Sequence, residues 1–264
     1  MFQQVTDFRE ESQTLFDLMQ PLGAEIFSTQ TQFKNWTFNE IIGHLYMWNW
    51  AADLSLKDEA SFHAFIAQVF QYVAGGKLRQ FETEWLDGLA GPELLQQWHG
   101  FVLEMSERFD AADPISRVKW AGPDMSVRSS ITARLMETWA HGLAVYDALG
   151  VERRDEDRIR NIAILGINTF GWTFQNRKLE VPAQKPYVRL TGPSGEIWEW
   201  NEFSENNRVS GAASGFCQVV TQTRNLADTD LQVEGDIANQ WMSIAQCFAG
   251  PPQQPPAAGT RFVQ

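Results

Sequence analysis

Residues Arg134–Gly150 read RLMETWAHGLAVYDALG, a segment that is apolar on almost every side of a helix. Glu137 and His141 lie among small and apolar residues, on the side opposite a core stripe of Ile131, Leu135, Trp139, Leu143 and Tyr146. A helix that is apolar all round is buried all round, and a buried carboxylate must be paired, hydrogen-bonded or bound to a cation. Because residues four apart share a helix face, the segment predicts either an internal Glu–His pair, with Arg134 as another partner for Glu137, or part of a metal site.

The remaining histidines offer one further candidate ligand. His44 lies mid-helix in EIIGHLYMWNW, where it is either a satisfied core histidine or a metal ligand. Glu40, one turn earlier, is explained by a capping box with Thr37 and is left out of the site. His63 and His99 are expected to be structural or partly exposed.

Together, His44, Glu137 and His141 make a set of two imidazoles and one carboxylate. Such a set holds zinc or another divalent first-row metal while leaving a coordination position open. Helical bundles build metal sites from side chains on facing helices. The spacing of Glu137 and His141 alone is a weak pattern, so the structural pair remains the alternative at this point.

The composition restricts the partners of the chain. Its 264 residues are 44% hydrophobic and 20% charged, with 33 acidic against 21 basic residues and a net charge of −12. The basic residues do not cluster, which argues against nucleic acid and anionic membranes as partners. No signal peptide or membrane-length apolar run is visible. Cys217 and Cys247 have no metal-type spacing and are expected to be buried thiols, so we expect a cytoplasmic protein.

The chain divides into a helical first part and a mixed second part. Periodicity and capping signals predict an α+β protein with helices over residues 5–22, 37–54, 61–73, 78–86, 92–113 and 126–149. Alternation around a Gly-Pro-Ser-Gly turn predicts a hairpin after residue 182, followed by strand, helix, short strand and helix. We therefore expect a helical bundle over 1–152, a connecting helix or linker over 153–181, a small α/β domain over 182–250 and a Pro-rich tail over 251–264.

The segments NWTFNEIIGHL and RLMETWAHG resemble the two signature segments of the mycothiol-dependent maleylpyruvate isomerase family. That family is part of the DinB-like metal-binding four-helix bundles. The resemblance covers the first 150 residues, and the later DLQVEGDIANQWMSIAQCFAG also fits a small α/β, sterol-carrier-like domain. It implies that His44, Glu137 and His141 hold zinc.

The resemblance also implies chemistry on a small-molecule thiol used as cosubstrate. An open zinc position deprotonates such a thiol at neutral pH. The thiolate then adds to a conjugated double bond of a small electrophile, the bond rotates and the thiol leaves, as in an isomerase. Other branches of the superfamily resemble S-transferases. Aromatic residues near the metal helices, Trp36, Trp48, Trp50 and Trp139, are either pocket walls or ordinary core.

Two departures from the family pattern limit what it implies. The family has an acidic residue near the position of Ala144, and Asp147 lies at a different phase of the helix. The last helix, IANQWMSIAQCFAG, lacks the arginine that the isomerase uses for its dicarboxylate substrate. Arg208 and Arg224 are weak substitutes, expected instead to be surface charges. We therefore expect a small-molecule substrate other than maleylpyruvate.

Two alternatives to a thiol-dependent isomerase or transferase remain open. One is a metal-dependent hydrolase that uses a metal-bound water. The other is a non-catalytic metal-containing protein whose C-terminal part binds an apolar ligand or a partner. The sequence leaves the oligomeric state undetermined.

Overall fold

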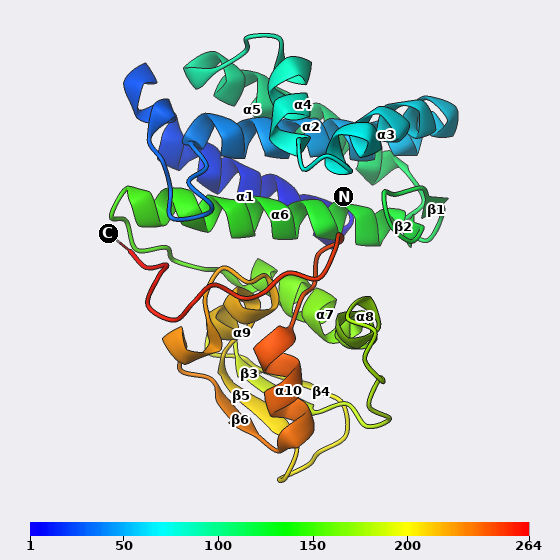
Figure 1. The fold of residues 1–264 in the computed structure, drawn as a ribbon, viewed down its shortest axis with the longest axis vertical. Helices are drawn as coiled ribbons and strands as arrows, with labels where there is room; N and C mark the ends of the chain where they lie inside the picture. The colour runs from blue at the N-terminus through cyan, green and yellow to red at the C-terminus, as the bar shows by residue number, and fades with distance from the viewer. Residues whose placement is uncertain (264) are drawn as a thin grey trace. The chain divides into compact units, whose positions relative to one another are not determined.

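The computed structural model describes residues 1–263. The chain forms two compact units, Met1–Ala148 and Leu149–Gln264. Figure 1 follows the order of their helices and strands along the chain. The predicted α+β class is confirmed: the first unit is helical and the second contains a small sheet.

The first unit is a bundle of the long helices α1 (Gln3–Met19), α2 (Phe38–Lys57), α5 (Gly91–Ala111) and α6 (Val127–Ala148). Helix α1 packs on α5 and α6, and α2 packs on the same two helices, so each long helix has two neighbours in the bundle. The shorter elements are η1 (Ala24–Ser28), α3 (Glu59–Val73), α4 (Leu78–Leu86), β1 (Arg117–Val118) and β2 (Met125–Ser126). Helices α3 and α4 both pack on α2, which makes α2 the most central helix of the unit.

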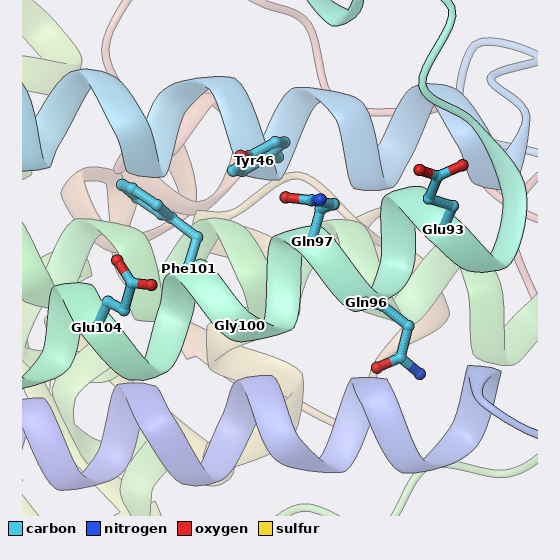
Figure 2. Close-up of a pocket in the computed structure, with 7 residues that line it drawn as sticks. All are labelled: Tyr46, Glu93, Gln96, Gln97, Gly100, Phe101 and Glu104. Atoms are coloured by element: carbon cyan, nitrogen blue, oxygen red, sulfur yellow. The ribbon is translucent and has the colours of Figure 1, made fainter.

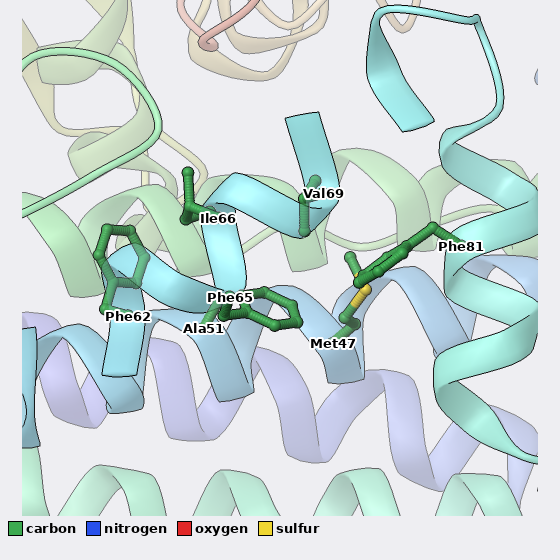
Figure 3. Packing of buried hydrophobic residues seen from close by; sticks show 7 residues of the cluster. All are labelled: Met47, Ala51, Phe62, Phe65, Ile66, Val69 and Phe81. Carbon is green, nitrogen blue, oxygen red and sulfur yellow. The ribbon is translucent and has the colours of Figure 1, made fainter. Parts of the chain in front are cut away.

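A hydrophobic cluster holds α3 and α4 against α2 (Figure 3). Its buried members are Met47, Ala51, Phe62, Phe65, Ile66, Val69 and Phe81. The rings of Phe65 and Phe81 lie 5.8 Å apart, and Trp50 of α2 lies 4.8 Å from Phe65. Burying a large apolar side chain contributes about 1.5–3 kcal/mol, so this cluster holds α4 firmly beside the middle of α2.

Helix α6 has the burial that its sequence predicts. Every residue from Ser130 to Ala148 is buried or half-buried. The core stripe is buried, with Ile131, Leu135 and Trp139 fully enclosed. Helix α1 ends at Met19 rather than at the expected Leu22, because Pro21 has no backbone N–H with which to continue the helical hydrogen bonds.

The second unit contains a sheet in the order β4-β3-β5-β6. Its elements are η2 (Asp157–Ile159), α7 (Arg160–Asn168), α8 (Phe170–Asn176), β3 (Tyr187–Thr191), β4 (Ile197–Trp200), β5 (Arg208–Ala212), α9 (Ala213–Val220), η3 (Leu226–Asp228), β6 (Gln232–Glu234) and α10 (Asp236–Ile244). Strands β3 and β5 run parallel, whereas the β3–β4 and β5–β6 pairs are antiparallel. The predicted hairpin turn lies between β3 and β4, where Gly195 adopts a φ of +87° that favours glycine.

Helices pack onto this sheet and enclose its core. Helix α9 packs on β3 and β5, and α10 packs on β6. Trp241 of α10 lies 5.7 Å from the ring of Phe216 and 5.3 Å from that of Phe170. Among the residues that the structure describes, every helix is too short or too polar to span a bilayer.

Candidate metal centre

Helix α6 brings Glu137 and His141 together. The two residues lie one turn apart, and Glu137 Oε2 is 3.1 Å from His141 Nε2. Their side chains are 19% and 11% exposed, so the carboxylate lies largely out of water. A carboxylate in such a place needs a counter-charge or strong hydrogen bonds.

Helix α2 supplies the third side chain. The predicted capping box starts the helix: Glu40 N–H donates to Thr37 Oγ1 at 3.2 Å, and Thr37 N–H donates to Glu40 Oε2 at 2.7 Å. His44 follows one turn after Glu40, and its Nε2 lies 3.8 Å from Glu137 Oε2. One ligand atom each from His44, Glu137 and His141 falls within 4.8 Å of the others. The structure therefore brings together all three residues that the sequence proposes as ligands.

A fourth residue, Glu82 of α4, was not identified from the sequence. Its Oε1 lies 2.7 Å from His44 Nδ1, and its side chain is 6% exposed. The signal for it is present in the sequence, because Leu78, Glu82 and Leu86 follow one another at helical spacing and a carboxylate interrupts an apolar stripe. No motif links Glu82 to His44, from which 38 positions separate it.

The charges of the site follow from this geometry. Burial alone lowers the pKa of His44, but the charge of Glu82 and hydrogen bonds with Glu137 and Glu82 outweigh it and raise the pKa to about 9. Burial opposes ionisation of Glu137, yet hydrogen bonds from both histidines hold its pKa well below its usual range. Burial lowers the pKa of His141. Without a metal, the site thus consists of an ionised Glu137, an imidazolium at His44 and a neutral His141.

Arg134 adds a positive charge beside this group. Its Nη2 lies 3.9 Å from Glu137 Oε1, and its side chain is 4% exposed. Within residues 1–263, its Nε and Nη1 have no hydrogen-bond partner. The guanidinium lies 5.0 Å from the centre of the Trp120 ring, a cation–π contact. The expected Arg134–Glu137 interaction is therefore present but long.

Aromatic rings enclose the two histidines. Trp36 stacks on His141 with ring centres 5.5 Å apart and meets His44 edge-on at 5.1 Å. Phe33 contacts His141 at 4.9 Å, and Trp48 lies 6.2 Å from His44. Of the tryptophans noted in the sequence, Trp36 and Trp48 therefore wall the site.

A cavity of about 190 Å³ opens beside His44, between α2 and α4. It is lined by both His44 and Glu82 and by the Arg79–Glu40 ion pair. A larger groove of about 470 Å³ lies between α2 and α5, where Tyr46 faces Phe101 at 5.6 Å (Figure 2). That groove has Glu93 and Glu104 on its α5 side and, within the described chain, none of the three candidate ligands.

The other residues singled out in the sequence have ordinary structural roles. Arg208 of β5 forms an ion pair with Glu234 at 2.6 Å. Arg224 was expected at the surface, but it is 9% exposed and donates a hydrogen bond to the carbonyl of Thr223. That expectation was wrong because a guanidinium can be buried where backbone carbonyls accept its hydrogen bonds. Cys217 and Cys247 are buried thiols, as predicted.

Comparison with known proteins gives a family match and similar chains. The model of the family described as "Mycothiol maleylpyruvate isomerase N-terminal domain" matches residues 8–146. Uncharacterized proteins from two strains of Mycobacterium tuberculosis are each 40% identical over 248 residues, covering 94% of this chain and 96% of the relative.

Two crystal structures of mycothiol-dependent maleylpyruvate isomerase have a similar fold. One, of a histidine-to-alanine mutant, has a TM-score of 0.53 at 15% identity and covers 83% of this chain and 88% of its own. The other has a TM-score of 0.51 at 14% identity, with coverages of 84% and 88%. At these identities the likeness concerns the fold.

Proposed function

This chain belongs to the mycothiol maleylpyruvate isomerase N-terminal domain family, as its two signature segments indicate, and from this premise we propose that it is a metal-dependent enzyme. It uses a small-molecule thiol of the mycothiol type to attack a small electrophilic substrate. His44, Glu137 and His141 hold zinc or another divalent first-row metal. The single observation that carries the proposal is the convergence of these three ligand atoms within 4.8 Å.

The residues fit a divalent metal by their chemistry. Two imidazoles and one carboxylate are a common zinc donor set that leaves at least one position for a further ligand. Glu137 is ionised, and a metal would take the place of the proton that the His44 imidazolium carries on Nε2, the nitrogen that faces Glu137. A divalent metal would thus replace the single positive charge of the imidazolium by two, and Glu137 would keep a counter-charge throughout.

A metal held there would supply a Lewis acid that lowers the pKa of a bound thiol, so that the thiolate is available near neutral pH. The chain's own residues fix where this happens. Trp36 and Phe33 pack against the ligand rings and exclude water from them. Arg134, 3.9 Å from Glu137, offsets part of the carboxylate charge.

The reaction class follows from a nucleophilic thiolate. In an isomerisation, sulfur bonds to one carbon of a conjugated double bond, and the π electrons move onto the conjugated carbonyl oxygen. The former double bond rotates, and reversal of the addition expels the thiolate and restores the double bond. In an S-transfer, a proton adds instead at the neighbouring carbon and the thioether is retained. Neither course needs an oxidant or a reductant.

The substrate is an electrophile other than maleylpyruvate. The last helix, α10, reads DIANQWMSI and carries no basic residue. A dicarboxylate at that helix would lack the charge-assisted hydrogen bonds that an arginine provides.

The test is metal content and thiol dependence of untagged protein. Plasma mass spectrometry should find about one zinc-like metal per chain in wild type and its loss in His141→Ala. His63→Ala is the matched control, because His63 is 58% exposed and forms its ion pair with the exposed Glu59. A folded, metal-free wild type after purification in zinc-containing buffer would refute the proposal.

An electrophile screen with and without mycothiol, glutathione or cysteine then separates the chemistries. Turnover that requires a thiol and disappears in His141→Ala supports the thiol-dependent enzyme. Metal-dependent turnover that is indifferent to thiol would replace it with a hydrolase. Metal binding without turnover across the screen would favour the non-catalytic alternative.

A further inference from the structure

We propose that Glu82 is a positioning residue of the metal centre, which holds the His44 ring with Nδ1 protonated and Nε2 directed at Glu137 and His141. This inference rests on the proposed function, because it presupposes a metal at those three residues. It adds to the centre a residue on a third helix, α4, outside both signature segments.

The two nitrogens of His44 have separate partners. Nδ1 lies 2.7 Å from Glu82 Oε1, whereas Nε2 faces Glu137 Oε2 at 3.8 Å. An ionised carboxylate only accepts hydrogen bonds, so the proton of this contact belongs to Nδ1. The lone pair of a neutral His44 is then on Nε2, on the side of Glu137. A carboxylate that fixes the tautomer of a ligand histidine in this way also makes the imidazole a stronger donor.

The packing of α4 on α2 places the Glu82 carboxylate beside Nδ1 of His44. Phe81, the residue before Glu82, belongs to the hydrophobic cluster that holds α4 on α2 (Figure 3). Leu86, one turn after Glu82, lies against Gly43, the residue before His44. A Cβ at Gly43 would come within 2.6 Å of Leu86 Cδ1, so the glycine leaves the space that this leucine fills. The close approach of α4 and α2 occurs at His44 itself.

The two ligand histidines are held by different means. The ring of His141 is stacked by Trp36 and contacted by Phe33. His44 meets Trp36 only edge-on and has the Glu82 hydrogen bond in addition. Stacking fixes the plane of a ring but does not select which nitrogen carries the proton. The carboxylate therefore supplies the tautomer selection for His44.

The test measures zinc affinity by competition with a chromogenic chelator. Loss of such outer carboxylates weakens metal binding by roughly 10- to 100-fold, so we expect Glu82→Ala near the upper end and Glu82→Gln, which keeps one acceptor oxygen, near the lower. Glu84→Gln is the matched control: it removes the same charge from the same helix, at an exposed residue that accepts hydrogen bonds from Tyr72 and Gln80. It should bind zinc as wild type does.

Long-range ¹H–¹⁵N NMR of the histidine rings in the zinc-loaded protein distinguishes a positioning role of Glu82 from a purely structural one. Wild type should show His44 protonated at Nδ1, and Glu82→Ala a mixture of tautomers or of bound states. Should Glu82→Ala fail to fold, the near-isosteric Glu82→Gln decides by its affinity against Glu84→Gln. Glu82 variants with wild-type affinity and tautomer overturn this inference and leave the proposed function intact. A wild type that binds no zinc overturns both.

Discussion

The metal-free protein should lose stability as the pH rises from about 6.5 to about 9, because of His44. Its pKa is about 9 in the fold against 6.5 for an unperturbed histidine. A group whose pKa is raised by folding stabilises the fold fully below its unfolded pKa and loses that contribution as the pH rises through the folded pKa. Each pKa unit is worth about 1.4 kcal/mol, so the contribution of His44 is about 3 kcal/mol at pH 6 and near zero above pH 9.

The assay is urea denaturation in chelator at a series of pH values, for wild type and His44→Gln in parallel. Titrations that the two proteins share cancel in the difference between their free energies of unfolding. That difference should shrink by about 3 kcal/mol across the window. In proteins that also carry Glu82→Gln, the same difference should shrink less with pH, because the charge of Glu82 is the largest cause that raises the pKa of His44. A difference that stays constant with pH would refute the reasoning, since His44 would then carry no extra proton in the fold.

Three further outcomes are expected. At the proposed centre zinc would displace the Nε2 proton of the His44 imidazolium, so its apparent affinity should rise about tenfold for each pH unit from about 7 to 9 in chelator competition, and a constant affinity would contradict this. Thr37→Ala removes the capping box of α2 and should cost about 1 kcal/mol of unfolding free energy in urea, whereas Thr83→Ala, at an exposed helical position, should cost less than half of that. Burial holds the pKa of the Cys217 thiol well above its usual range, so intact-mass analysis should find it unalkylated by iodoacetamide in the native protein at about pH 8 and alkylated after denaturation; labelling of the native protein would show that the core opens.

Local patterns predicted most of the helices and part of the site. The capping box at Thr37 and the burial of α6 followed from spacings of three and four residues, which a helix converts directly into contacts. For the same reason Glu137 and His141 were paired correctly. His44 was a candidate because it lies mid-helix among apolar residues, and the family resemblance favours it as a ligand; no local rule connects α2 to α6.

Local patterns do not predict contacts between segments that are distant in the sequence. Glu82 reaches His44 only because α4 folds back onto α2, and the sequence of α4 does not say which helix it packs against. The parallel pairing of β3 with β5 across the β4 hairpin has no local signal either. Arg224 was misplaced at the surface because charge alone does not reveal which backbone carbonyls lie nearby.

The division of the proposed ligands between α2 and α6 has a consequence for synthesis of the protein. A ribosome releases His44 long before Glu137 and His141, which enter the chain only with the last helix of the first unit. With the proposed ligands so divided, a nascent chain would hold isolated donors, and it would acquire a chelating set only when the bundle closes. Metal loading would thus report that the first unit is complete, and a chain truncated before α6 would compete poorly for the cell's zinc.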